Sequence, residues 1–209
     1  PFTFREGLGL WPWTFFLFVL SAAGAGTLFT LLCGELMEKC TGKRLISNGC
    51  KQFLAKTGGV LLAAYVAAKG ADTLAWATDI LPRYGRVFGD MFQGALYGEW
   101  LLVMELGLCG ALPCLILLVP ALRRRVGLAR LAALLACLGV FINRYVQTVQ
   151  NLAVPSLPFE GWASYLPNWT EVAPCLAAVA YGVIVFSLAY RYLPLFPAEK
   201  EVEQKTAGK

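Results

Sequence analysis

The chain has 209 residues, of which 58% are apolar and 15% are charged, and its formal net charge is +5. A soluble domain has about a quarter of its residues charged, so this composition excludes an ordinary soluble domain and predicts a polytopic membrane protein. The chain has no histidine, and its seven cysteines form no C-x-x-C pair. These absences exclude bis-histidine haem and histidine-ligated zinc and predict no metal site.

Five apolar segments are each long enough to cross a bilayer, which takes about 20 residues of helix. They cover residues 10–33, 52–76, 92–119, 126–150 and 169–193. The third segment contains Pro113, where we expect a kink. The sequence therefore predicts an all-α membrane bundle of about five helices, a single domain over residues 1–193. The polar tail that follows covers residues 194–209.

Basic residues are distributed unequally between the two ends of these segments. The connection at residues 34–51, the connection after the third segment and the tail carry Lys39, Lys43, Arg44, Lys51, Arg123, Arg124, Arg125, Lys200, Lys205 and Lys209. The opposite side carries only Arg5, Arg83 and Arg86. Because lysine and arginine concentrate in cytoplasmic loops, we expect the N-terminus outside and the C-terminus and tail in the cytoplasm.

Five charged residues remain inside the apolar segments, where an unpaired charge is costly: Lys69, Asp72, Glu99, Glu105 and Arg144. With a rise of 1.5 Å per residue, Glu105 falls near the midplane, and the other four fall in one layer of the outer half of the membrane. That layer draws on three different helices. Lys69 and Asp72 are three residues apart and share a helix face.

Two interpretations of this charge layer stay open at this point. The charges could simply hold helices in register as buried polar contacts. Alternatively, because three carboxylates face two cations, one acid is in excess and could carry protons or contact a polar ligand. Asn143 and Tyr145 flank Arg144 and supply neutral donors, either for bonds between helices or for that ligand.

The order of motifs resembles a known family. The motifs are "FFLFVLSAAGAG", "LLAAYVAAKGADTL", "YGEWLLVMELGLCGALPCLILL", "LGVFINRYVQ" and "YLPNWTEVAPCLAAVAYGVIVFSLAYRYLPLFP". Over about residues 10–197 the chain is similar to the second half of NrfD/PsrC-type quinone-interacting membrane subunits, especially the HybB-like branch. The lysine at position 69 departs from the arginine expected there. The family's better-established quinone site lies in its first helical bundle, which has no counterpart in these motifs.

The resemblance implies a subunit of a quinone-linked respiratory complex in the bacterial inner membrane, not catalytic by itself and without a cofactor of its own. Menaquinone or ubiquinone would be its diffusible partner. A ferredoxin-like iron–sulfur subunit, a catalytic redox subunit or a multihaem cytochrome with haem c, and a complementary membrane half would be its protein partners. The rival functions are a purely structural anchor for extrinsic redox subunits, or half of a small transporter.

Overall fold

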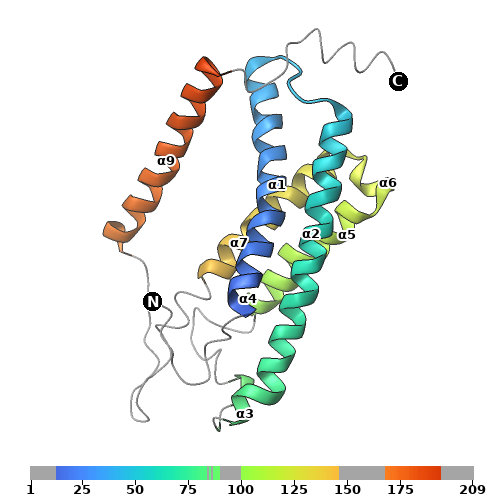
Figure 1. Ribbon diagram of the computed structural model, residues 1–209, viewed down its shortest axis with the longest axis vertical. Coiled ribbons are helices and arrows are strands. Elements are labelled where there is room, and N and C mark those ends of the chain that lie inside the picture. Colours follow the sequence, from blue (N-terminus) through green and yellow to red (C-terminus); the bar gives the residue numbers. More distant parts are fainter. Residues whose placement is uncertain (1–12, 84, 86, 90–99, 146–167, 194–209) are drawn as a thin grey trace.

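The computed structural model describes residues 13–83, 85, 87–89, 100–145 and 168–193, and every regular element among them is helical (Figure 1). Among the described residues, five helices are long and apolar enough to cross a membrane, which confirms the predicted fold class. These spans are Phe15–Thr41, Asn48–Asp79, Trp100–Leu118, Val126–Tyr145 and Trp169–Tyr192.

The first two spans are the long helices α1 (Trp13–Thr41) and α2 (Asn48–Ala75), and α2 continues into the π-helix η1 (Trp76–Ile80) and the short α3 (Leu81–Arg83). The prediction of a connection over residues 34–51 was wrong. In the structure, the connection between α1 and α2 covers only residues 42–47. Hydropathy locates the apolar part of a helix and not its end, which here extends beyond the apolar run. Gly42, at φ 68°, ends α1 in the left-handed conformation that favours glycine.

The third span consists of α4 (Trp100–Leu102), the π-helix η3 (Val103–Ala111) and α5 (Leu112–Leu118). The predicted start of this span at residue 92 lies outside the described residues. A short helix, α6 (Pro120–Arg123), leads to the fourth span, α7 (Val126–Tyr145), whose predicted extension to residue 150 also lies outside them. The fifth span is α9 (Trp169–Tyr192), which agrees with the predicted segment to one residue.

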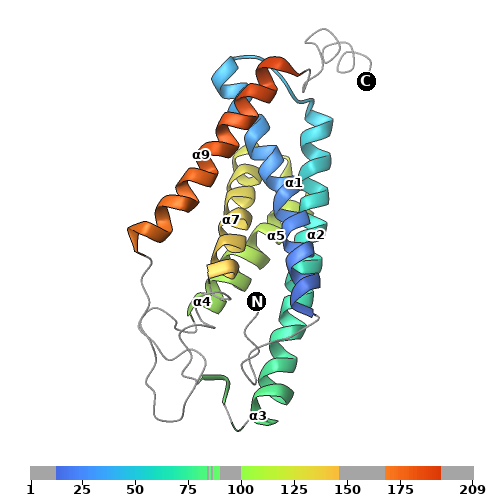
Figure 2. The same cartoon turned by 60° about the vertical axis from the view of Figure 1, so that its left-hand side comes forward.

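The core lies between α1, α2, α5 and α7, which pack against one another as a bundle (Figures 1 and 2). Its buried side chains are mostly leucine and alanine. Helix α9 stands beside this bundle in Figure 1, and none of its residues is buried. Among the described membrane spans, the buried residues therefore come from the other four.

Glycines of α2 allow this helix to approach α1 and α5 closely. A Cβ on Gly59 of α2 would lie 2.7 Å from the Cβ of Leu117, and one on Gly58 would lie 2.6 Å from a methyl carbon of Leu28. Contacts this short leave no room for a methyl group. The interface of α2 with α1 and α5 therefore depends on small residues, as is usual between membrane helices.

We expect Gly59→Ala to destabilise the protein by about 1–3 kcal/mol, because the added methyl group overpacks the contact with Leu117. Gly70→Ala is the matched control in the same helix, since a Cβ there would have no heavy atom within 4 Å. Thermal unfolding of both variants in detergent checks the prediction. Equal stability of the two variants would contradict it.

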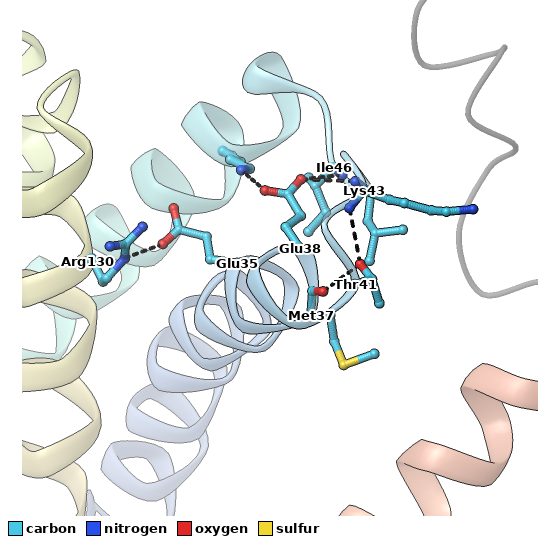
Figure 3. A network of polar contacts seen from close by, with 9 residues as sticks. Glu35, Met37, Glu38, Thr41, Lys43, Ile46 and Arg130 are labelled. Carbon is cyan, nitrogen blue, oxygen red and sulfur yellow. Dashed lines mark hydrogen bonds and ion pairs between the residues drawn. The ribbon is translucent and has the colours of Figure 1, made fainter.

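Ionic contacts join the helices at the end of the bundle that holds the α1–α2 connection (Figure 3). The Glu38 carboxylate accepts hydrogen bonds from the backbone N–H groups of Leu45 and Ile46 at 3.0 and 2.9 Å, and it forms an ion pair with Lys51. The guanidinium Nε of Arg130 on α7 donates to a carboxylate oxygen of Glu35 on α1 at 2.7 Å.

Arg123 adds a further contact at this end, because its Nε donates to the Gln52 side-chain oxygen at 3.1 Å. We call the six residues of these contacts the ionic end: Glu35, Glu38, Lys51, Gln52, Arg123 and Arg130. It fixes the short connection and ties α1, α2, α6 and α7 together at one end of the bundle.

A buried carboxyl cluster as candidate functional site

The candidate site is built around Glu105, which lies in the π-helix η3. Pro113 lies two residues after the end of this segment, and it has no N–H to offer the carbonyl of residue 109 and crowds that carbonyl in a regular helix. A turn with i→i+5 bonding relieves this conflict, and such π segments are frequent at functional sites. A nine-residue π-helix therefore precedes Pro113, and the kink expected at Pro113 stays a prediction.

Two neighbouring helices supply hydrogen-bond donors to the same oxygen of this carboxyl group. The Tyr65 hydroxyl of α2 donates to Glu105 Oε1 at 2.8 Å. The Asn143 amide Nδ2 of α7 donates to the same atom at 2.6 Å. The three side chains form what we call the carboxyl cluster, which joins three separate spans through one oxygen atom.

The carboxyl cluster is enclosed by protein. Glu105 is 3% exposed, Asn143 2% and Tyr65 5%. Cys109, one turn further along η3, is also buried, and a Cβ on Gly139 of α7 would lie 2.7 Å from the Cys109 Cβ. Because desolvated polar groups are costly unless they are bonded, the two donors are what makes a carboxyl group tolerable here.

Arg144 follows Asn143 directly but points to another helix. Its guanidinium lies over the Phe18 ring, 3.5 Å from the ring centroid, and Nη2 donates to the Phe18 backbone carbonyl at 3.4 Å. Cation–π contacts of this kind stabilise by about 0.5–2 kcal/mol. The Ser21 hydroxyl donates to the same carbonyl at 3.0 Å. Among the described residues, Arg144 forms no ion pair with a carboxylate; Glu99, one of its candidate partners, lies outside them, so the predicted charge layer at Arg144 stays a prediction.

The remaining predicted residues lie around this cluster or outside the described part. Lys69 and Asp72 are half-buried on α2. The charges of Asp72 and Arg144 both act on the Tyr65 hydroxyl. Tyr145 is the last residue of α7. Glu99 lies outside the described residues, so its predicted place in the layer is not tested.

Tyr65 is the partner that sequence reasoning missed. A tyrosine in an apolar segment is usually read as packing, since its ring is apolar and its hydroxyl is small. A signal was present, however. Tyr65, Lys69 and Asp72 are spaced i, i+4 and i+7, which places all three on one face of α2.

Comparison with known proteins places the chain beside membrane subunits of reductases. It is 52% identical over 206 residues to the "Menaquinone reductase, integral membrane subunit" of Nitratidesulfovibrio vulgaris, and this match covers 98% of this chain and 49% of that protein. It is 28% identical over 230 residues to a protein of Halobacterium salinarum that is named as a membrane subunit of a dimethyl sulfoxide reductase. That match covers 99% of this chain and 52% of that protein.

No protein-family model matches the chain, and no solved structure matches it. The chain spans about half the length of the curated relatives it matches. Over nearly its whole length, the chain is therefore similar to about half of two integral membrane subunits, one of a menaquinone reductase and one named for a dimethyl sulfoxide reductase.

Proposed function

We propose that the chain acts as a membrane subunit of a quinone-linked respiratory reductase complex and that Glu105 transfers protons within it. The subunit is not catalytic by itself. The similarity to a menaquinone reductase subunit supports a quinone as the diffusible partner, and it favours menaquinone over ubiquinone. The carboxyl cluster is the observation that supports proton transfer, because reduction of a quinone to a quinol takes up two protons with two electrons.

Burial supports proton transfer by Glu105 rather than direct contact with the quinone headgroup. Glu105 is 3% exposed, and its carboxyl group accepts hydrogen bonds from Tyr65 and Asn143, which argues against a quinone ring beside it. Arg144 is half-buried near the end of α7 and is better placed to donate to a quinone carbonyl. Lys69 and Tyr145 are further candidate donors, and Asp72 and Glu99 are further candidates for proton transfer.

The two oxygens of Glu105 have different roles in this proposal. Oε1 accepts from both donors, whereas Oε2 has no hydrogen-bond partner among the described residues. A proton therefore binds and leaves at Oε2, while Oε1 remains an acceptor in both the protonated and the ionised carboxyl group. Tyr65 and Asn143 hold the side chain in one orientation and stabilise the negative charge after the proton has left.

The partners belong to the proposal as well. Electrons would come from or go to a ferredoxin-like iron–sulfur subunit, which is linked to a catalytic subunit or a multihaem cytochrome with haem c. A complementary membrane half would bring the assembly to the length of the relatives. We also propose that the chain belongs to the HybB-like branch and lies in the bacterial inner membrane. Its N-terminus would be outside and its C-terminus inside, and the bias of the loop charges supports this orientation.

A purely structural anchor is the second candidate function, and one observation favours it. The carboxyl cluster joins α2, η3 and α7, so it is also a contact that holds three spans together. The two candidates differ in what a neutral substitution at Glu105 does. If the role is structural, a substitution at Glu105 that keeps the hydrogen bonds leaves the function intact. If Glu105 transfers protons, any substitution that removes its proton abolishes the function.

Purification from the native membrane in a gentle detergent, followed by mass spectrometry, tests the proposed assembly. We expect an iron–sulfur subunit or multihaem cytochrome and a complementary membrane half to co-purify, and we expect the purified complex to reduce or oxidise a menaquinone analogue. Recovery of the chain alone, or only with copies of itself, would reject the respiratory function in favour of the transporter alternative.

A further inference from the structure

The two carboxylates of the ionic end are already paired with cations. Glu35 accepts from Arg130 at 2.7 Å, and Glu38 forms an ion pair with Lys51. The other acids among the described residues lie further along α2 and η1, in η3, or in the first turn of α9. Within this part of the chain, a further cation at the ionic end therefore has no carboxylate of its own to balance it.

Four basic residues beside these pairs form what we call the basic corner: Lys56, Arg123, Arg124 and Arg125. Arg123 ends α6, the next two arginines connect α6 to α7, and the lysine lies in α2. The lysine and the last two arginines are exposed. None of the four forms an ion pair with a carboxylate of the described residues. The corner is thus a concentration of positive charge that these residues leave unbalanced.

Arg123 is held in place by neutral acceptors. Its Nε donates to the Gln52 side-chain oxygen at 3.1 Å, and its Nη1 donates to the Leu117 carbonyl at 2.8 Å. Its Nη2 has no hydrogen-bond partner among the described residues. Because the two bonds fix the plane of the guanidinium, the remaining N–H groups point in a set direction. A fixed guanidinium with donors to spare suits the oxygens of a phosphate group.

Contacts along α2 place Lys56 beside the same corner. Gln52 bonds to Arg123, and a Cβ on Gly59 would lie 2.7 Å from the Cβ of Leu117. These two contacts lie on either side of Lys56 in the sequence, and the three residues of α2 are spaced i, i+4 and i+7 on one helix face. Lys56 therefore lies on the side of α2 that meets α5 and α6.

The surroundings of Lys56 are those of a lipid-facing surface. It lies inside the membrane span Asn48–Asp79, about 12 Å of helix from the first residue of that span. Phe53 and Val60, one turn away on either side, are exposed, and so is Leu115 of α5. A lysine at this depth extends its amine toward the headgroup layer while its methylene chain lies along apolar surface. Figure 1 places α6 on the side of the bundle away from α9, so α9 does not cover this surface.

We propose that the basic corner binds the phosphate group of an anionic phospholipid, whose acyl chains lie along the exposed apolar side chains of α2 and α5. Arg123 presents its unused N–H groups to the phosphate oxygens, and Lys56 and Arg124 add positive charge. The exposed apolar side chains beside Lys56 favour a lipid over a free phosphate ion. The depth of Lys56 within a span favours a lipid over the surface of an extrinsic protein. In the proposed orientation this end faces the cytoplasmic leaflet, whose anionic lipids attract basic segments.

Native mass spectrometry of the purified and delipidated complex tests the proposal. Phosphatidylglycerol, which is anionic, is titrated against phosphatidylcholine with the same acyl chains, which is zwitterionic. We expect phosphatidylglycerol to bind at least tenfold more tightly, because several basic residues act on its net charge. Inorganic phosphate at the same concentration is expected not to displace it, because a free ion gains nothing from the apolar side chains.

Matched variants locate the site. Lys56→Gln and Arg124→Gln are each expected to weaken phosphatidylglycerol binding about fivefold, the factor that corresponds to about 1 kcal/mol for each basic residue near an anionic lipid. Both side chains are exposed and have no partner among the described residues, so we expect both variants to fold normally, which thermal unfolding checks. Arg83→Gln is the control, since it removes an exposed arginine from α3, beyond the opposite end of α2.

The possible outcomes are distinct. Weaker binding in Lys56→Gln and Arg124→Gln, with native affinity in Arg83→Gln, would establish the lipid site. Equal affinity for the two lipids, or native affinity in both corner variants, would overturn it. Displacement by inorganic phosphate would show a site for free anions instead. Loss of a co-purifying subunit from the corner variants, with lipid binding unchanged, would assign the corner to a protein partner. None of these results depends on proton transfer by Glu105.

Discussion

Glu105→Gln is expected to lower the quinone-linked turnover of the assembled complex by about 100-fold or more, which is the usual contribution of a positioned proton donor. The glutamine carbonyl keeps the acceptor at the position of Oε1, so the bonds from Tyr65 and Asn143 at 2.8 and 2.6 Å are retained. Only the proton at Oε2 is lost, because an amide does not titrate. Steady-state turnover with a menaquinone analogue is the measurement.

Assembly and a matched variant complete this experiment. The Glu105→Gln complex should purify with its partners in normal yield, since its hydrogen bonds are intact. Glu35→Gln removes a carboxylate of α1 at the ionic end, and we expect it to retain turnover. Normal turnover in Glu105→Gln would exclude proton transfer by this residue and leave the structural anchor as the function of the cluster.

The second large effect concerns stability. Asn143→Leu is expected to lower the free energy of unfolding by about 1.5–3 kcal/mol, because it removes a donor from a carboxyl group and leaves that group short of a partner in the interior. Asn143 is 2% exposed and donates to Glu105 Oε1 at 2.6 Å, so water does not replace the lost bond. Thermal unfolding in detergent measures the change.

The same substitution in a second background isolates the contact. In Glu105→Leu the acceptor is already gone, and replacing both members of a buried pair by apolar groups of similar shape costs little. We therefore expect Asn143→Leu to cost clearly less in the Glu105→Leu background than in the native protein. An equal cost in both backgrounds would mean that Asn143 stabilises the protein by packing alone.

Much of the fold follows from the sequence, because the length and apolar character of a membrane span are local properties. The span Trp169–Tyr192 was predicted to one residue, and Val126 was predicted as the start of α7. The end of α1 was placed eight residues too early, at 33 instead of Thr41. Hydropathy detects the part of a helix that crosses the membrane, whereas its end is decided by the left-handed Gly42 and by the bonds that Glu38 makes to Leu45 and Ile46.

The hydrogen-bond and ion-pair partners of the charged residues could not be predicted from the sequence in the same way. The sequence places Glu105 near the midplane and Arg144, the neighbour of Asn143, in the outer half, so the contact between Glu105 and Asn143 was not predicted. It could not indicate that Tyr65 would share the same oxygen, or that Arg144 would stack on Phe18. Depth along a helix follows from residue number, but the direction of a side chain around the helix axis depends on how neighbouring helices pack.

By itself, then, the sequence determined that the chain crosses a membrane about five times and that a few costly polar residues lie within its spans, because both follow from local composition. Only the tertiary structure decided which of these residues meet. The π-helix before Pro113 and the close approaches at Gly59 and Gly139 set the helix rotations that bring Tyr65 and Asn143 to Glu105. The same packing buries the leucine and alanine side chains of α1, α2, α5 and α7 against one another, since shape complementarity between helices is a property of the whole bundle.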